Sequence, residues 1–236
     1  MTLAISGIPD AEASPRNQAT AVYEALRQDI LAGRLGPGKK LKVQDLAATL
    51  GVSPGAVREA LSRLVPEQLV VSRDQRGFTV APLSIGDLED LTELRCEIEA
   101  IAVRRSIARA DVDWEAGLIA AEHRLRGMPP SRPGTEPALN PLWVTHHAAF
   151  HTALIGACGN RRLLALHARL YEQSERYRGL STFVDSVRNI ADEHQQITAF
   201  ALARDADRLV DALTAHMRET TRLIVAAARN GAILEV

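Results

Sequence analysis

The histidines are the residues of this chain whose type and spacing point most directly to chemistry. Three of the seven in the 236-residue chain, His146, His147 and His151, fall within the six-residue stretch HHAAFH. His147 and His151 are four residues apart, the spacing that lets two imidazoles on one helix reach the same ion. Imidazoles arranged in this way could bind a metal, act as catalytic groups, or fill part of a core.

Two further histidines interrupt apolar stripes that have a helical period. His194 shares a predicted face with Ile197, and His216 shares one with Leu213. A buried polar group without a hydrogen-bond partner costs about 1–3 kcal/mol, whereas one divalent ion would accept a lone pair from every inward imidazole. The sequence therefore predicts a single metal site between three helices. Its predicted ligands are His147, His151, His194 and His216.

The other three histidines are expected outside this site. His146 lies about 100° around the helix from His147, so we expect it to be exposed or to stand beside the ligands. No partner is evident for His123 or His167, and a solvated position is the favoured interpretation of both.

A metal-dependent hydrolase is an alternative, because three or four histidines around Zn²⁺ also suit the activation of water. Against it, the chain has no HExxH sequence, and Glu193 beside His194 is expected to project about 100° from the metal-facing side. A closed, purely structural four-ligand site is a third possibility. An open coordination position would favour an effector site, and turnover of an ester or amide would favour the enzyme.

Composition indicates a mainly α-helical protein in which Ala, Leu and Arg dominate and aromatic residues make up 4%. The formal net charge of −1 gives no sign of a nucleic-acid or membrane partner, although residues 1–80 carry +2 and the remainder −3. The cysteines, Cys96 and Cys158, are far apart, and neither a signal peptide nor an apolar run near 18 residues is evident. We expect a soluble cytoplasmic protein.

The first 82 residues predict a small domain of three helices and a β-hairpin. Residues 1–17 lack any period and are interpreted as a flexible arm. The expected elements are a helix from Thr20 to Gly33, short helices over 43–50 and 54–65, and two strands within 69–82. This order of elements over residues 18–82 is typical of a winged helix-turn-helix, whose second short helix enters the major groove of DNA.

The turn between the two short helices has the chemistry that such a motif requires. Ser53 is a good N-cap, Pro54 suits the first helical position, and Gly51 suits a turn with positive φ. The outer face of the second short helix is left to Gly55, Arg58, Glu59 and Ser62. Any small helical hairpin with a glycine turn would share this pattern, so a structural role is the alternative to DNA binding.

The segment PGKKLKVQDLAATLGVSPGAVREALSRLVPEQLVVSRDQRGFTV resembles the DNA-binding domain of GntR-type transcription regulators. The shared pattern runs from Pro-Gly through a Leu-Ala helix to Gly-Val-Ser, Val-Arg-Glu-Ala-Leu and a wing ending in Arg-Gly. The resemblance covers nearly all of residues 20–80. It implies DNA contacts by Gln44, Ser53, Pro54, Gly55, Arg58, Arg76 and Gly77.

The sequence departs from that family pattern at a few positions. Pro54 and Gly55 stand where the family commonly has Arg and then Thr, and Ala56 stands where it has Pro. A base-reading arginine is therefore missing, and the operator is expected to differ from the common family site. Gln68 replaces a usual glycine before the wing.

From Asp87 to about residue 230 the pattern is helical, broken by one proline-rich loop over residues 127–141. Here LRCEIEAIAVRRSIA, FHTALIGACGN and EHQQITAFALARDADRLVDALTAHM resemble the FCD ligand-binding domain of the FadR-like branch of the same family. The resemblance implies an all-α helical bundle over residues 87–230 that binds an effector and dimerises. The metal of many members is held by an Asp and three His.

The resemblance assigns three ligands directly and changes the fourth. His151, His194 and His216 match the three family histidines, and His147 stands where the family has its Asp. This exchange replaces an anionic oxygen with a neutral nitrogen. The site is therefore expected to favour Zn²⁺ or Ni²⁺ over Mn²⁺, because imidazole suits these metals.

Arg95 is the candidate for effector binding. It lies on an apolar helical stripe, where a buried guanidinium needs an anion. An ion pair with Glu99 one turn away, or an arginine whose head reaches solvent, would explain it equally well. The resemblance implies that an arginine at this position helps to hold a carboxylate effector, and Arg176 and Arg178 are further candidates whose facing the sequence leaves open.

These observations together predict a metabolite-responsive transcription regulator rather than an enzyme. A winged helix reads a half-site, so we expect a homodimer on a pseudo-palindromic operator in double-stranded DNA, with no membrane partner. A small organic acid, bound through the metal and Arg95, is expected to change the affinity for DNA.

Overall fold

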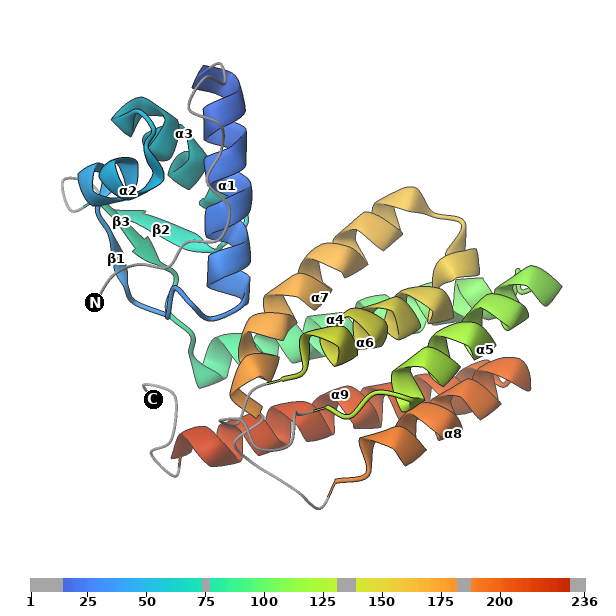
Figure 1. Cartoon of the computed structure of the whole chain (residues 1–236). Coiled ribbons are helices and arrows are strands. Elements are labelled where there is room, and N and C mark those ends of the chain that lie inside the picture. Colours follow the sequence, from blue (N-terminus) through green and yellow to red (C-terminus); the bar gives the residue numbers. More distant parts are fainter. Residues whose placement is uncertain (1–14, 74–76, 131–138, 182–187, 230–236) are drawn as a thin grey trace. The chain divides into compact units, whose positions relative to one another are not determined.

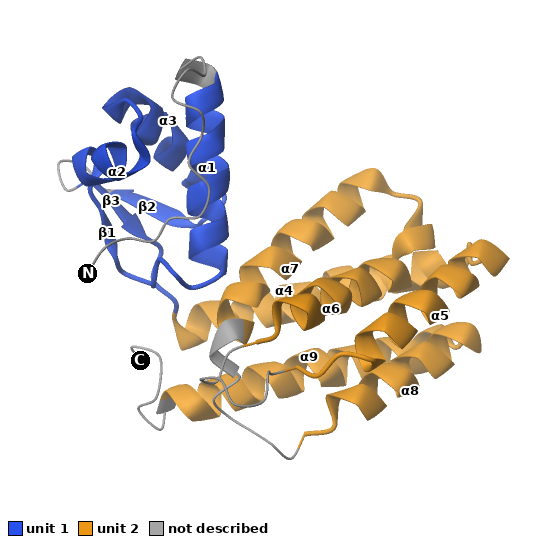
Figure 2. Ribbon diagram, viewed as in Figure 1, with its two compact units in different colours: residues 1–83 blue, residues 84–236 orange. Residues whose placement is uncertain are grey.

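The computed structural model describes residues 15–73, 77–130, 139–181 and 188–229. Contacts within the chain separate two compact units, Met1–Leu83 (unit 1) and Ser84–Val236 (unit 2), coloured blue and orange in Figure 2. This division falls between the two predicted domains, residues 18–82 and 87–230.

The described part of unit 1 combines helices with a small antiparallel sheet (Figure 1). Its elements are α1 (Pro15–Leu31), β1 (Lys40–Leu41), α2 (Val43–Leu50), α3 (Pro54–Leu64), β2 (Val70–Arg73) and β3 (Gly77–Val80). The strand order is β1-β3-β2, with Lys40 opposite Thr79 and Val70 opposite Val80. This arrangement confirms the predicted winged helix-turn-helix.

Two element boundaries in unit 1 differ from those expected. Helix α1 begins at Pro15 rather than Thr20, so residues 15–17 of the predicted flexible arm are helical, while residues 1–14 lie outside the described chain. Proline suits the first turn of a helix because its missing N–H would be unpaired there in any case. Strand β1 was not predicted, since its strand partner among the described residues is almost forty residues away in β3 and leaves no local pattern.

The turn between α2 and α3 forms as its residues predict. Gly51 has φ +66°, the left-handed conformation that glycine adopts without a steric penalty. Ser53 accepts a hydrogen bond at its Oγ from the Ala56 amide at 3.2 Å, and Pro54 opens the helix. These caps fix where α3 begins and therefore which of its side chains face outward.

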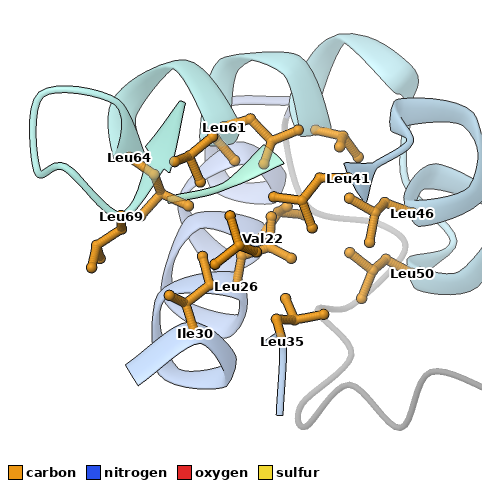
Figure 3. Close-up of a cluster of buried hydrophobic side chains, with 14 of the residues drawn as sticks. Val22, Leu26, Ile30, Leu35, Leu41, Leu46, Leu50, Leu61, Leu64 and Leu69 are labelled. Carbon is orange, nitrogen blue, oxygen red and sulfur yellow. The ribbon is translucent and has the colours of Figure 1, made fainter. Parts of the chain in front are cut away.

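The core of unit 1 is aliphatic (Figure 3). Its labelled side chains come from all three helices and converge on one another: Val22, Leu26, Ile30, Leu35, Leu41, Leu46, Leu50, Leu61, Leu64 and Leu69. Leu61 and Leu64 of α3 are fully buried, so the opposite face of this helix is presented to solvent. Burial of such side chains stabilises a domain by roughly 1.5–3 kcal/mol each.

Gln68, between α3 and β2, adopts φ +60°. A left-handed backbone costs a non-glycine residue about 1–2 kcal/mol. This conformation explains physically why a glycine suits the position and shows that the chain tolerates its absence.

Unit 2 is helical throughout its described residues, as predicted. Its elements are α4 (Ile85–Ile107), α5 (Val112–Arg126), α6 (Pro141–Leu154), the short 3-10 helix η1 (Gly156–Cys158), α7 (Arg161–Ser181), α8 (Ile190–Leu202) and α9 (Ala206–Arg229). Helix α9 packs along α4 and α8, and α5 packs on α6 (Figure 1). None of the described helices is long and apolar enough to cross a membrane.

Helix α6 is positioned by its first turn and by one buried face. The Asn140 side chain accepts a hydrogen bond from the Leu142 amide at 3.1 Å, and Pro141 occupies the first helical position. The residues on its buried face are Trp143, His147, Phe150, His151 and Leu154. The same stripe thus anchors the helix through its apolar members and turns two imidazoles into the bundle.

Candidate metal centre

The four predicted metal ligands come together in the interior of unit 2. His147 and His151 extend from α6, His194 from α8 and His216 from α9. One ligand nitrogen of each lies within 4.8 Å of the others, and all four side chains are buried. Nitrogens around an ion with bonds of about 2.0–2.1 Å lie closer together than this limit, so a small contraction would complete a coordination sphere.

The two histidines of α6 are held by neighbouring rings. The His147 and His151 Nε2 atoms are 3.2 Å apart, and the His147 Nδ1 atom lies 2.7 Å from the Tyr171 hydroxyl. The indole of Trp143 stacks on His147 with ring centroids 4.6 Å apart. These contacts fix the imidazole planes and direct the two Nε2 atoms toward the same point.

Glu193 is a part of the site that the sequence interpretation missed. Its Oε2 atom lies 2.7 Å from Nδ1 of His216 and 2.6 Å from Nη2 of Arg188. When His216 donates its Nδ1–H to this carboxylate, its Nε2 lone pair is left available to an ion, as in many metal sites. Glu193 does project away from the ligand group, as expected, but it does so to orient a ligand from another helix.

Two imidazole nitrogens in the cluster lack hydrogen-bond partners among the described residues. They are Nε2 of His194 and Nδ1 of His151, both fully buried. The free Nε2 atom of His194 is the kind of group that a divalent ion satisfies, whereas Nδ1 of His151 lies on the other side of its ring, 4.0 Å from Oε2 of Glu99. The donor set therefore fits a metal.

The four imidazoles are neutral near pH 7. Burial lowers the pKa of His194 to about 2, with help from the positive charges of its neighbours. Burial also lowers the pKa of His147, His151 and His216, and Arg178 lowers that of His147 further. Because metals bind neutral imidazole, no proton has to leave before an ion enters.

Arg95 lies in the buried network next to the cluster. Its Nη2 is 2.6 Å from Oε1 of Glu99, and its Nη1 donates to Ser174 at 2.8 Å. Burial opposes ionisation of Glu99, but Arg95 and His167 outweigh it and lower the pKa of this carboxyl to about 2. The ion pair considered from the sequence is therefore present.

His167 is not solvated, so its predicted position was wrong. It is buried, with Nε2 3.4 Å from Oε1 of Glu99. Its anionic partner is on a different helix, and the local pattern of α7 carries no trace of it. His123 is exposed, as expected, and His146 is half-buried outside the ligand group.

Arg178 approaches the cluster most closely of the three candidate arginines. It is buried, and its Nη1 atom lies 2.9 Å from Nε2 of His147 and also contacts Nδ1 of that ring. Burial would lower its pKa, but Glu175 and Tyr171 outweigh burial and raise it, so the guanidinium stays charged. Arg176 is half-buried on the neighbouring side of α7.

A cavity of about 20 Å³ adjoins the histidines between α4, α7 and α9. Arg95, Ser174, Arg178 and Thr220 line it together with His151 and His216. A second cavity of about 50 Å³ reaches His194 between α5, α6 and α8, and its lining is largely apolar. Only the first presents two cationic side chains, so an anion would enter on that side.

The residues predicted to contact DNA lie on the surface of unit 1. The exposed positions on α2, α3 and the turn between them are Gln44, Ser53, Pro54, Gly55 and Arg58. Gly77 is exposed at the start of β3, with φ +79°. Arg76 lies outside the described residues.

The carboxylates beside the cluster are poor general bases. Hydrogen bonds from Arg188 and His216 outweigh burial and lower the pKa of Glu193 to about 2, similar to that of Glu99. Efficient general bases have a pKa nearer the working pH. The geometry therefore favours ligand binding over hydrolysis.

Comparison with known families covers both units. Residues 18–80 match the family described as bacterial regulatory proteins, gntR family, and residues 90–219 match the FCD domain. The uncharacterized HTH-type transcriptional regulator BphR of Paraburkholderia xenovorans (strain LB400) is 38% identical over 91% of this chain and 90% of its own. The HTH-type transcriptional repressor GlaR of Escherichia coli (strain K12) is 35% identical over 83% and 90%.

Solved structures share the fold. E. coli McbR/YncC superposes with a TM-score of 0.71 at 20% identity, covering 89% of this chain and 98% of that one. A GntR family member from Pseudomonas syringae pv. tomato str. DC3000 gives 0.52 at 26% identity, covering 92% and 90%. The relatives are named as regulators of transcription, which leaves the hydrolase alternative without support. The chain therefore belongs to the GntR family of bacterial regulatory proteins and is a DNA-binding transcriptional regulator with an FCD domain as its second unit.

Proposed function

We propose that this regulator binds one divalent metal ion through His147, His151, His194 and His216, together with a small carboxylate effector. Occupancy of this site changes the affinity of unit 1 for operator DNA. The working form is a homodimer on a pseudo-palindromic operator, since one winged helix reads one half-site. A DNA partner in a bacterium places the protein in the cytoplasm.

The observation that carries this proposal is the set of four buried, neutral imidazoles, two of which, His151 and His216, line a cavity whose wall also contains Arg95 and Arg178. A purely structural ion needs no such cavity, whereas an effector site needs an open coordination position. An all-imidazole ligand set suits Zn²⁺ or Ni²⁺. The bound ion would supply a positive, Lewis-acidic centre for an anionic oxygen, and Arg95 would hold the same ligand from the cavity wall.

The exposed face of α3 supports the DNA-binding half of the proposal. Arg58 is the basic side chain on this face that also matches the family pattern, and an arginine there can form a bidentate pair with a guanine. Gln44, Ser53, Pro54, Gly55 and Gly77 lie nearby in the motif and are proposed to position the protein on the duplex, with Arg76 predicted from the sequence alone.

One experiment separates the two halves. An operator is first selected from random duplexes, and its affinity for the whole protein is then measured at fixed salt with chelator, with Zn²⁺ and with Ni²⁺. We expect the metal to change operator affinity in the wild type. Arg58→Ala should lose about 1–3 kcal/mol of operator binding in every condition, whereas His194→Ala should lose the metal response alone.

The exposed His123 provides the matched control, because His123→Ala removes an imidazole outside the cluster. Light scattering of the same samples reports the oligomeric state. A wild type that retains no Zn²⁺ or Ni²⁺ after dialysis, and whose operator affinity ignores both ions, would show that these are core histidines.

A further inference from the structure

Arg178 is a cation that lies where a metal ion would approach His147. Its Nη1 atom is 2.9 Å from Nε2 of His147, and the same atom contacts Nδ1 of the ring. An ion bound to that Nε2 would sit about 2.1 Å from it. The guanidinium nitrogen and the ion would therefore stand within about 5 Å of each other, two positive charges against one ring.

Their repulsion would be strong, because neither charge can be discarded. A guanidinium keeps its proton at any ordinary pH. The site is buried, and charges in a buried site are poorly screened. Arg178 must therefore withdraw from His147, or an anion must come between the two cations, before the ion is held tightly.

The cavity next to Arg178 links these two requirements. At about 20 Å³ it has room for about one water molecule, too little for an organic acid. Arg178 forms part of its wall, as do Arg95 and Ser174. Movement of the Arg178 guanidinium away from His147 would both reduce its repulsion of an incoming ion and widen the space in which a carboxylate could bind.

The charges of the described residues point to the same ligand. Glu99 lies 2.6 Å from Arg95, and Glu175 lies 3.2 Å from Arg178, so both cavity arginines already have a carboxylate partner. Imidazoles coordinate a metal as neutral ligands. A divalent ion therefore adds two positive charges that no described ligand balances, and the missing negative charge has to come from a bound anion.

We propose that Arg178 couples metal binding to anion binding. In the absence of an anion, the Arg178 guanidinium stays in contact with His147 and keeps the affinity for metal low. A carboxylate bound between the ion and the guanidinium would be attracted to both and would replace their repulsion by a favourable bridge. The metal and the acid then bind cooperatively, and each raises the affinity of the other by the same factor. This inference rests on the proposed function, because it requires that the histidines bind a metal.

The test measures Zn²⁺ affinity of the whole protein by competition with a chromophoric chelator. Arg178→Met removes the charge at similar length and should bind Zn²⁺ at least about tenfold more tightly than the wild type. Arg178→Lys keeps a positive charge and should remain close to the wild type. Arg176→Met, which removes the neighbouring arginine outside the cavity, is the matched control and should leave the affinity unchanged.

The second arm repeats the Zn²⁺ titration with acetate or succinate at about 50 mM. Chloride at the same ionic strength is the reference, so that the screening of charges is equal in all samples. The wild type should gain Zn²⁺ affinity with at least one of these acids, by about 5–150-fold, and Arg178→Met should not. Trp143 fluorescence and far-UV circular dichroism establish that each variant is folded.

The outcomes distinguish the two ideas. If neither the wild type nor Arg178→Met binds Zn²⁺, the proposed metal site itself is wrong. If the wild type binds Zn²⁺ and Arg178→Met binds it equally or more weakly, Arg178 is not a competing cation and the coupling is overturned. In a third outcome, Arg178→Met binds Zn²⁺ more tightly than the wild type, but neither acid changes the Zn²⁺ affinity of the wild type. This result would support repulsion between Arg178 and the ion and would refute the carboxylate bridge.

Discussion

Unit 1 and unit 2 are both helical, but they bury opposite kinds of side chain. Unit 1 contains none of the seven histidines, and Asp29, paired with Arg34 at 2.6 Å, is the one buried polar side chain among its described residues. Unit 2 buries two arginines, two glutamates and five histidines. The core of unit 1 requires only that its apolar side chains fit together. The core of unit 2 also requires a hydrogen-bond or charge partner for each buried polar group.

This difference shows that the candidate functional residues lie on the surface in unit 1 and in the interior in unit 2. Unit 1 closes an aliphatic core and leaves the side chains proposed to contact DNA, such as Arg58, exposed on the outer face of α3. Unit 2 places its proposed metal ligands inside, where burial keeps the imidazoles neutral and strengthens each charge–charge interaction. A surface suits DNA, and an interior suits a small ligand.

The largest expected difference between the two units is in how much stability each loses when the pH is lowered. In protein freed of metal, lowering the pH from 7 to 5 should destabilise unit 2 by up to about 2 kcal/mol for each buried histidine that stays neutral, and unit 1 hardly at all. The folded-state pKa values lie below the unfolded value of 6.5, and that of His194 is about 2. The unfolded chain therefore binds more protons in this window, and stability is lost as the pH falls below 6.5.

Urea unfolding at the two pH values measures this effect. Both tryptophans, Trp114 and Trp143, lie in unit 2, so their fluorescence reports that unit alone. Glu99 and Glu193 do not contribute to this change in stability between pH 7 and pH 5. Their pKa values are about 2 in the folded unit, so the stability that they provide is lost only as the pH falls below about 4.5. Equal tryptophan midpoints at pH 7 and pH 5 would contradict the comparison.

Matched leucine truncations should affect each unit separately. Leu61→Ala in α3 and Leu118→Ala in α5 each remove a fully buried side chain, and each should lower the unfolding free energy of its own unit by about 2–5 kcal/mol. Only Leu118→Ala should move the tryptophan transition. Loss of Zn²⁺ affinity in Leu61→Ala would show that the two cores are not independent.

The smallest expected effect comes from two non-glycine residues that have positive φ in the described part of the chain, Gln68 in unit 1 (φ +60°) and Arg204 in unit 2 (φ +56°). Gln68→Gly should stabilise unit 1 by about 0.5–1 kcal/mol, because glycine relieves the left-handed strain. Arg204→Gly should gain less, since it also breaks the 2.8 Å ion pair with Glu115. Thermal melts would reveal a lower stability of Gln68→Gly if the strain is absent.

Much of the fold could be predicted because its signals are local. The cap at Ser53, the turn at Gly51 and the apolar stripe of α6 each lie within a few neighbouring residues. Strand β1 could not, because two residues pair with a strand far along the chain. The start of α1 was missed because the segment before Thr20 has no apolar period.

The site divides in the same way. The clustering of the four proposed ligands could be predicted, since each interrupts an apolar stripe on one of three helices. Glu193, Arg178 and the buried position of His167 were not, because each depends on a partner from another helix: His216, His147 and Glu99 respectively. Periodicity along one helix shows which residues face inward but not what they meet there.

A sensor differs from a scaffold in that its empty state must also be stable and folded. The described surroundings of the histidines carry matched charges in buried or half-buried pairs, and the imidazoles are neutral, so the site is balanced without an ion. The pairs are Arg95–Glu99, Arg178–Glu175 and Arg188–Glu193. Small zinc domains, by contrast, use the free energy of ion binding to fold at all. If unit 2 binds an ion as proposed, that free energy remains available to favour one conformation over another, and the concentration of the ion or effector would then be read as a change in transcription.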